Sequence, residues 1–334
     1  MRQIDSSRRR TFFGNISIRI LSNLDGLKWF VIVNPIAGGH RGKSQWQRLE
    51  RQLLNVNISY EAYLTKGSGD ASNQAVKAFQ QNFRNFIIVG GDGTHHEFVN
   101  GIMDLPSHDR RSVCYALFPA GTGNDFARHF RLPFKADHWL TYLSQASCTP
   151  IDVGRIDIAE LAPIYFINEA GLGFEAAVVQ RLATQHSNSR SNLRYLLEAI
   201  KTIFSYRGVR IRITNDDSSP ELHLWNLTVA NCRFLGGGFQ LAPEASPFDG
   251  HLALAIILKT TKWTVIRNIL YFFNGTIGQL NYTNHHQSSG ILVEPVDDSE
   301  VLIQVDGEIR GSLPAQFSTT AQAINFYVPL NYLK

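Results

Sequence analysis

The stretch FIIVGGDGTHHEFVNG, residues 86–101, joins an apolar run to a glycine-rich turn and then to a stretch with helical character. Glycines let backbone N–H groups approach phosphate oxygens, and a helix N-terminus favours an anion there. Asp92 would repel phosphate unless a divalent cation lay between them, so it predicts Mg²⁺. Thr94 can cap the helix or bond a phosphate. An ordinary strand-to-helix turn is the alternative. Such a turn does not require the glycines and the aspartate that crowd residues 90–94.

Two further loops repeat this construction. In YALFPAGTGNDFARHF, residues 115–130, a strand leads into Gly121, Thr122, Gly123, Asn124 and Asp125, with a short helix after them. In VIVNPIAGGHRGKS, residues 31–44, a strand leads into Asn34-Pro35 and then Gly38-Gly39. Because consecutive parallel strands end at the same edge of a sheet, the three loops predict one nucleotide site.

The segment 37–44 also resembles a P-loop, with Ala37 in place of the first glycine. A P-loop protein concentrates phosphate binding in its first loop. Here the glycine–aspartate loops come later and are richer, and Pro35 does not favour a wrapped phosphate nest. We therefore expect Lys43 and Ser44 to begin an ordinary helix.

The spacing of apolar residues predicts two domains with different secondary structure. Short apolar strands at 28–33, 58–64, 85–90 and 113–118 alternate with helical stretches such as 70–83, which predicts a doubly wound parallel α/β sheet over residues 28–150. After Pro150 several strands alternate with period two, which predicts a mostly antiparallel β domain over 151–313. Helical stretches near 192–206 and 262–273 carry Arg194, Lys201, Lys262 and Arg267 opposite an apolar face. We expect these helices to cover a sheet, with a membrane-surface role as the alternative.

Composition limits the function classes. The chain has 334 residues, 44% apolar and 18% charged, with a net charge of +4, which suits a protein that meets phosphates or an anionic membrane and is too weak to indicate nucleic acid. Cys114, Cys148 and Cys232 form no C-x-x-C pair and predict small buried thiols in a reducing compartment, with no disulfide framework. No apolar run approaches the roughly 18 or more residues needed to span a bilayer, so a soluble protein is expected. Residues 1–27, with arginines at 8–10, predict a poorly ordered basic extension, or else a segment resting on anionic lipid.

Taken together, these motifs resemble the diacylglycerol kinase catalytic-domain family, in particular its soluble bacterial lipid kinases. The resemblance rests on NPIAGG (34–39), GGDGTHHEFVNG (90–101), GTGNDFAR (121–128) and DVG (152–154). It continues with GFEAAVV (173–179), GGGFQLAPEASPFDG (236–250) and VDGE (305–308), in family order. GGDG alone is shared with NAD kinases and sphingosine kinases.

The resemblance implies ATP in a cleft between an α/β domain and a β-sandwich-like domain, with the chain returning to the first domain at 314–334. It implies a lipid kinase that uses ATP and Mg²⁺ to phosphorylate the primary hydroxyl of diacylglycerol to phosphatidic acid. Such an enzyme would be cytoplasmic and would visit the inner membrane surface. A homodimer is compatible with the family.

The resemblance also assigns residues. The nucleotide would contact Asn34, Pro35, Gly38, Thr65, Gly90, Gly91, Asp92, Gly93, Thr94, His95, His96, Gly121, Thr122, Gly123, Asn124 and Asp125. Asp92, Asp125 and Asp152 resemble an acidic network that organises magnesium. Glu308 matches the general base, and Asp306, two residues earlier on the expected strand, would face the same side, so either could be the base. A second, structural Mg²⁺ would take the Asp249 carboxylate and the Ser246 and His251 carbonyls, with a plain turn as the alternative.

Some residues depart from the family pattern. His95-His96 replaces the usual apolar residue and Asn. Adjacent helix residues point about 100° apart and make poor joint zinc ligands, so we expect His96 to bond phosphate or loop backbone. His285-His286 is expected in a solvated polar loop. Alternative readings are a kinase of a sphingoid base or NAD, or a nucleotide-sensing protein without catalysis; the GTGND and VDGE segments favour the lipid kinase.

Overall fold

A computed structural model of the chain describes residues 24, 26–184, 192–215, 218–330 and 332. The N-terminal extension expected at 1–27 therefore lies almost wholly outside the described residues, as does the side chain of Arg194. None of the helices in these ranges is long and apolar enough to cross a membrane.

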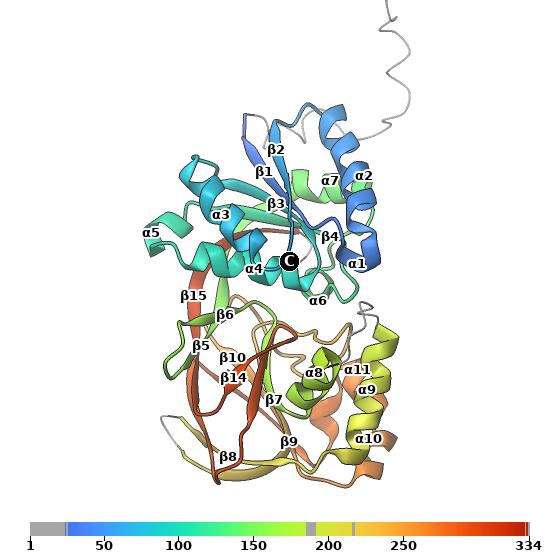
Figure 1. Cartoon of the computed structure of the whole chain (residues 1–334), viewed down its shortest axis with the longest axis vertical. Helices are drawn as coiled ribbons and strands as arrows, with labels where there is room; N and C mark the ends of the chain where they lie inside the picture. The colour runs from blue at the N-terminus through green and yellow to red at the C-terminus, as the bar shows by residue number, and fades with distance from the viewer. Residues whose placement is uncertain (1–23, 25, 185–191, 216–217, 331, 333–334) are drawn as a thin grey trace, which may run out of the picture.

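The first half of the chain builds a parallel sheet in the order β4-β3-β1-β2 (Figure 1). Its strands are β1 (Trp29–Val33), β2 (Tyr60–Leu64), β3 (Asn85–Gly90) and β4 (Cys114–Pro119). β1 and β4 are buried along their whole length, which is why they are continuous apolar runs. The doubly wound α/β fold predicted from the sequence is confirmed.

Helices cover both faces of this sheet. α2 packs against α7 on one face, and α3 packs against α4 on the other (Figure 1). The helices are α1 (Ala37–His40), α2 (Gly42–Asn55), α3 (Asp70–Gln80), α4 (Asp92–Met103), α5 (Ser107–Arg110), α6 (Asp125–His129) and α7 (Ala136–Gln145). Lys43 and Ser44 lie in the first turn of α2, where the Ser44 hydroxyl donates to the Arg41 carbonyl.

The second half is antiparallel. Its strands are β6 (Ile164–Phe166), β7 (Glu169–Gly173), β8 (Val209–Thr214), β9 (Glu221–Ala230), β10 (Leu252–Leu258), β11 (Thr283–Ser288), β12 (Gly290–Pro295), β13 (Leu302–Val305) and β14 (Glu308–Ser312). The expectation that His285 and His286 lie in a polar loop is wrong, because both residues lie in β11, which pairs with β10. A sheet edge tolerates polar side chains when only its backbone is paired.

The helices of this half are α8 (Phe174–Thr184), α9 (Asn192–Ser205), α10 (Lys262–Arg267), α11 (Ile269–Asn274) and the short η3 (Ile277–Gln279). Strand β10 shows why they are needed. Leu252, Leu254 and Ile256 point into a core formed by strands of the second half. The alternating residues Ala253, Ala255 and Ile257 point into a second core on the other face of the strand. Ile203, Val265 and Phe272 from α9, α10 and α11 close that second core. The helices cover a sheet, as expected.

One ribbon of two strands joins the halves. β5 (Ser147–Ile158) and β15 (Ala315–Val328) pair antiparallel along nearly their whole length (Figure 1). At one end β15 runs parallel to β4 through Asn325 and Phe326, and at the other end it pairs with β12. The domain boundary expected at residue 150 therefore falls inside a continuous strand, because the crossing is a hydrogen-bonded ribbon and not a linker.

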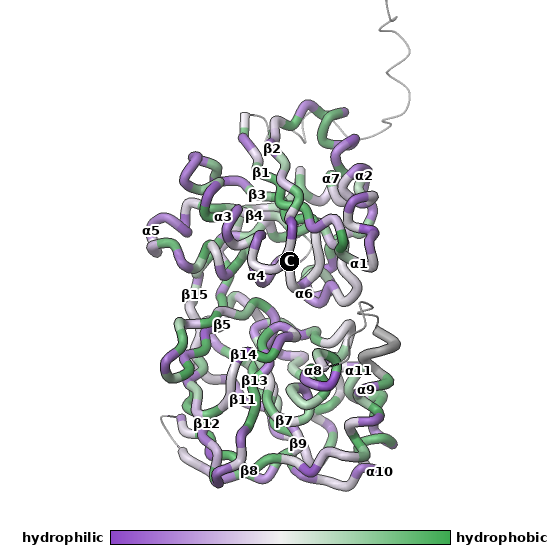
Figure 2. The backbone as a smooth tube through the Cα atoms, in the orientation of Figure 1, coloured by the Kyte–Doolittle hydropathy of each residue, from purple (hydrophilic) through white to green (hydrophobic). Residues whose placement is uncertain are grey.

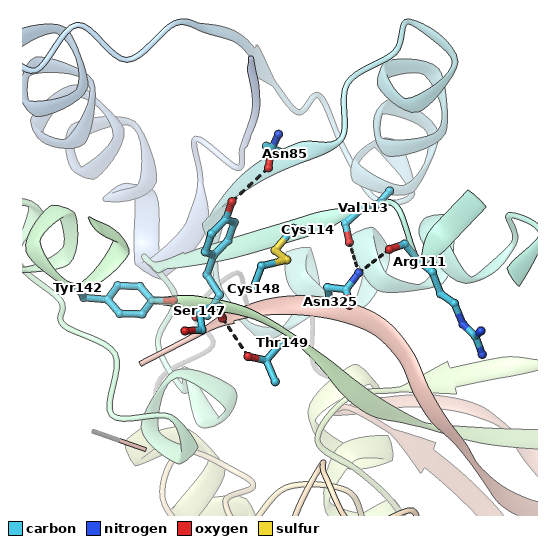
Figure 3. The surroundings of a disulfide bond; sticks show 10 residues. Asn85, Arg111, Val113, Cys114, Tyr142, Ser147, Cys148, Thr149 and Asn325 are labelled. Atoms are coloured by element: carbon cyan, nitrogen blue, oxygen red, sulfur yellow. Dashed lines mark hydrogen bonds between the residues drawn. A yellow bond between two sulfur atoms is a disulfide. The ribbon is translucent and has the colours of Figure 1, made fainter. Parts of the chain in front are cut away.

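The expectation of three free thiols is wrong. Cys114 on β4 and Cys148 on β5 form a disulfide, with their Cα atoms 6.2 Å apart (Figure 3). Their separation of 34 residues in sequence gives no sign of this, because the two cysteines meet only when β15 returns beside β4. Cys232 stays free and buried.

The disulfide predicts the number of reactive thiols. Titration of the unfolded, unreduced protein with a thiol reagent should find one free thiol, that of Cys232. After reduction the same titration should find three. Three thiols before reduction, in protein prepared without reductant under air, would contradict the pairing.

Candidate nucleotide and catalytic site

Glycines hold the three predicted loops together by backbone contact. A Cβ on Gly121 would lie 2.4 Å from the Cα of Gly91, which joins the loops after β4 and β3. Gly38 has φ +60°, and a Cβ there would lie 2.3 Å from the carbonyl oxygen of Ala120. A larger side chain would push these loops apart, so the glycines first serve the packing of loop on loop.

Hydrogen bonds extend the contact to the loops after β1 and β2. The Asn34 side-chain amide donates to the Thr94 hydroxyl at 2.9 Å, and the Thr65 backbone N–H donates to the Val33 carbonyl. In contrast, a Cβ on Gly39 or Gly93 would meet nothing within 4 Å. These two glycines leave backbone open at the edge of the sheet, where a phosphate can approach it.

Asp92 and Asp125 lie buried at the meeting of the two later loops. The Asp92 Oδ1 atom accepts the backbone N–H of Asp125 at 2.9 Å and that of Phe126 at 3.4 Å, at the beginning of α6. The Asp125 Oδ2 atom accepts the backbone N–H of Gly237, which comes from the second half of the chain, at 2.8 Å. Asp125 Oδ1 is buried and has no hydrogen-bond partner among the described residues.

The raised pKa values of Asp92 and Asp125 show that two negative charges here are unfavourable without a cation. Burial, and after it the charge of Asp92, raise the pKa of Asp125 to about 7. Burial also raises the pKa of Asp92, and Asp306 adds to the rise. A cation beside two buried carboxylates would reverse this penalty.

The donor set fits Mg²⁺, which takes one or two carboxylates and fills its other positions with phosphate oxygens and water. The described ranges contain no group of three His, Cys, Asp or Glu that could hold a metal by themselves. Phosphate oxygens would therefore have to complete the coordination. The unpartnered Asp125 Oδ1 would be the atom free to coordinate such an ion.

Asn124 and Thr122 belong to the loop after β4. Asn124 adopts φ +53°, and its side chain both accepts the Gly121 N–H and donates to the Gly121 carbonyl, each at 2.9 Å. Its amide is therefore used to shape the loop. Thr122 is half-buried in this loop, and Pro35 is half-buried in the loop after β1.

The two histidines of the pair have different surroundings. His95 is fully buried against the rings of Tyr115 and Phe126, and its backbone N–H bonds the Gly91 carbonyl, so it presents no group to the loop edge. Burial lowers the pKa of His95 to about 3. The His96 Nδ1 atom bonds the Asp306 carboxylate at 2.8 Å and not loop backbone, and a bond from His96 to phosphate stays a prediction.

Asp306 and Glu308 differ in burial and in hydrogen bonding, and the expectation that they share a strand is wrong. Asp306 lies in the turn between β13 and β14 with φ +45°. Besides His96, its carboxylate accepts the backbone N–H groups of Ile167, Asn168 and Glu169. Burial would raise the pKa of Asp306, but the hydrogen bond and charge of His96 lower it below its usual value.

Glu308 opens β14 with its side chain 37% exposed. One of its oxygens accepts from Arg310 Nη2 at 2.8 Å, and the same Nη2 lies 3.3 Å from His96 Nε2. The hydrogen bond between His96 and Asp306 ties the hairpin β13–β14 to α4 of the first half. Asp306 holds this junction, and Glu308 alone of the two is open to a substrate.

The Asp152 carboxylate is bonded at the crossing between the halves. Its two carboxylate oxygens accept the backbone N–H groups of Gln322 and Gly250, each at 2.7 Å. Gln322 lies where the β5–β15 register is interrupted. Both carboxylate oxygens therefore have a backbone partner at the crossing between the halves, and a role of Asp152 in organising magnesium stays a prediction.

The loop predicted to hold a structural Mg²⁺ is closed by its own hydrogen bonds. The exposed Asp249 carboxylate accepts the His251 N–H at 3.0 Å, and the His251 ring bonds the Asp249 carbonyl at 2.7 Å. Ser246 is half-buried nearby in the chain. A metal at this loop stays a prediction.

Sequence reasoning missed a buried acidic cluster in the second half. Glu169 on β7 and Glu175 on α8 are both bonded by the Gln304 side-chain amide, at 2.7–2.8 Å and 3.3 Å respectively. Burial raises the pKa of both groups. The signal was present in NEAGLGFE, residues 168–175, where two acids stand in an otherwise apolar run. Arg310 was also missed, although its period-two spacing from Glu308 on β14 could have indicated it.

Comparisons with known proteins agree with this architecture. Residues 28–156 match the family model described as diacylglycerol kinase catalytic domain, and residues 169–328 match the YegS C-terminal NAD kinase beta sandwich-like domain. The chain is 27% identical to a diacylglycerol kinase of Staphylococcus saprophyticus, over 90% of this chain and 94% of that one. It is 26% identical to a diacylglycerol kinase of Staphylococcus aureus, over 90% and 91%. A diacylglycerol kinase structure from Bacillus anthracis superposes with a TM-score of 0.67 at 22% identity, over 91% and 97%.

The buried cluster predicts a pH dependence of stability. Burial raises the pKa of Glu175 from 4.5 to about 7, against the lowering effect of hydrogen bonds from Thr228, Asn226 and Gln304. Between these values the folded state holds a proton that the unfolded state releases, so stability falls as pH rises through this window. Glu175→Gln removes the titration. Its free energy of unfolding relative to the wild type should rise by on the order of 2–3 kcal/mol from pH 5 to pH 8.

Urea unfolding at the two pH values measures this difference. Glu300→Gln, at an exposed position, is the matched control and should show no such change. An equal stability difference for Glu175→Gln at both pH values would contradict the buried, protonated state.

Proposed function

The chain belongs to the diacylglycerol kinase catalytic-domain family, and from this premise we propose that it transfers the γ-phosphoryl group of ATP to the primary hydroxyl of diacylglycerol, giving phosphatidic acid. The lipid-kinase class follows from the family. The observation that carries the proposed reaction is the buried Asp125 oxygen, unpartnered among the described residues, beside Asp92 at the edge of three glycine loops.

In this proposal the phosphates of ATP lie against the open backbone at Gly39 and Gly93. Asp92 and Asp125 would hold Mg²⁺, which would supply neutralisation of the phosphate charge. Asp92 also fixes the beginning of α6 through its other oxygen, so the loop after β4 is held in place before ATP arrives. Such positioning supplies most of the catalysis in phosphoryl transfer.

Glu308 is the general base in this proposal. The acceptor hydroxyl oxygen forms its bond to the γ-phosphorus while the bond to the β–γ bridging oxygen breaks, ADP leaves, and the hydroxyl proton passes to Glu308. Arg310 holds the carboxylate by the 2.8 Å ion pair and links it to His96. Asp306 acts as a positioning residue, because His96 and three backbone N–H groups already occupy its carboxylate.

The different surroundings of the two acids predict different defects. Glu308→Gln should lower kcat by roughly 10²–10⁴-fold with unchanged stability, because a partly exposed base is lost and little packing changes. Asp306→Asn should instead lower the free energy of unfolding by about 3 kcal/mol or more, because a buried pair with His96 loses its charge. Steady-state kinetics and urea unfolding of both variants measure this. A full rate in Glu308→Gln, with Glu300→Gln as control, would contradict the assignment of the base.

The acceptor is identified by phosphate transfer from labelled ATP with Mg²⁺. Diacylglycerol in mixed micelles, a sphingoid base and NAD are offered in parallel, with Asp92→Asn as the inactive control. We expect labelled phosphatidic acid alone. Labelled NADP or a labelled sphingoid phosphate would replace the proposed acceptor, and tight ATP binding without transfer to any of the three would favour a nucleotide sensor.

A further inference from the structure

Helices α9, α10 and α11 expose an unusual number of large apolar side chains. We call this set the apolar ridge: Leu197, Ile200 and Phe204 on α9, Trp263 on α10, and Leu270 and Phe273 on α11. Within the described ranges these are six of the thirteen exposed large apolar residues. Trp263 is 72% exposed, and its ring contacts that of the half-exposed Phe204.

Covering a sheet does not require this ridge. The opposite sides of the same helices already bury Ile203, Val265 and Phe272 in the second core. A helix that only covers a sheet carries one apolar face and a polar outer face. Here the outer face is also apolar in part, and Figure 2 shows hydrophobic stretches along α9. An exposed patch of this kind marks a surface that meets a partner.

The charge around the ridge favours an anionic partner. Residues 199–215 and 250–293 contain seven Lys and Arg and no Asp or Glu, although the net charge of the whole chain is only +4. Lys262 and Lys259 donate to the carbonyls of Phe204 and Arg207, which places both ammonium groups at the C-terminal end of α9. Arg267 ends α10 and is exposed. Lys201 is paired with Glu198 and Arg212 with Glu221, so neither adds uncompensated charge.

The apolar surface also continues inward. A cavity of about 70 Å³ lies beneath the three helices, and all but Glu175 and Asn226 of its fourteen lining residues are apolar. Ile200 both lines this cavity and is 43% exposed. The ring of Phe239, another lining residue, stacks on that of Phe273 in the ridge at 4.1 Å between centroids. Hydrocarbon chains suit a surface that is apolar both outside and beneath.

We propose that the apolar ridge is the face on which the protein lies against an anionic lipid bilayer. Trp263, Phe204 and Leu270 enter the boundary between headgroups and acyl chains, and Arg267 and Lys262 meet the headgroup phosphates. The choice of a bilayer over a protein partner rests on the proposed function, since the acceptor lipid resides there. Docking itself does not require catalysis.

Binding to vesicles tests the ridge directly. The full chain is sedimented with vesicles of phosphatidylcholine alone or mixed equally with phosphatidylglycerol. The double variant Phe204→Ser, Trp263→Ser should bind the mixed vesicles at least tenfold more weakly than the wild type. The control double variant Leu54→Ser, Phe134→Ser removes two comparably exposed apolar residues of the α/β half and should bind like the wild type. Arg267→Glu should weaken binding to the mixed vesicles only, with Arg51→Glu as its control.

Tryptophan fluorescence gives a second readout. Trp29, Trp46, Trp139 and Trp225 are at most 4% exposed, so Trp263 is the one tryptophan that a surrounding bilayer reaches. Mixed vesicles with brominated acyl chains should quench the wild type and leave Trp263→Phe unquenched. Binding without quenching, or equal binding by both double variants, would overturn the proposal. A dimer that dissociates in Phe204→Ser, Trp263→Ser would also overturn it, because a second copy would then cover the ridge.

These outcomes separate the two proposals. Phosphorylation of a short-chain, water-soluble diacylglycerol by a protein that binds no vesicle would leave the proposed function standing and remove the docking face. Vesicle binding through the ridge without transfer to any lipid would confirm the docking face and remove the proposed function. The ridge variants should phosphorylate the short-chain substrate at the wild-type rate.

Discussion

The hydrogen bonds from the Asp125 and Phe126 N–H groups to Asp92 are the interaction on which the site depends. Asp92 is the first residue of α4, directly after β3, and the two N–H groups that donate to it lie at the beginning of α6, after β4. One carboxylate therefore fixes both loops. Asp125 then passes the connection to Gly237 in the second half. The glycine contacts between these loops make this short connection geometrically possible. Together with the β5–β15 ribbon, they connect the two halves.

Buried carboxylates fall into two classes here, and the distinction separates structural from chemical roles. Asp306 and Asp152 have hydrogen-bond partners on both oxygens, namely His96 and backbone N–H groups for Asp306 and the N–H groups of Gln322 and Gly250 for Asp152. Asp125 keeps an unpartnered oxygen, among the described residues, next to a second acid. A buried acid without compensation lowers stability, and a protein retains it where a ligand supplies the missing charge. The uncompensated pair therefore supports the proposal that a cation and phosphates bind beside it.

Local patterns in the sequence predicted the parts of the fold that depend on local physics. Apolar runs followed by glycine loops located β1, β3 and β4 and the edge where their loops meet. Pairings between distant residues were not accessible. The Cys114–Cys148 disulfide, the His96–Asp306 pair and the role of Asp152 each require the return of β15 or the docking of the β13–β14 hairpin. No spacing in one sequence specifies such a contact.

The central claim, that three glycine loops and the Asp92–Asp125 pair form a metal-dependent nucleotide site, is tested most directly by calorimetric titration of ATP without any lipid. We predict one ATP per chain, bound at least tenfold more tightly with Mg²⁺ than with EDTA, because the two carboxylates repel bare phosphates. Asp125→Asn should lose most of this metal dependence while still binding ATP. Equal affinity with and without Mg²⁺ in the wild type, or an Asp125→Asn variant with undiminished metal dependence, would contradict the account.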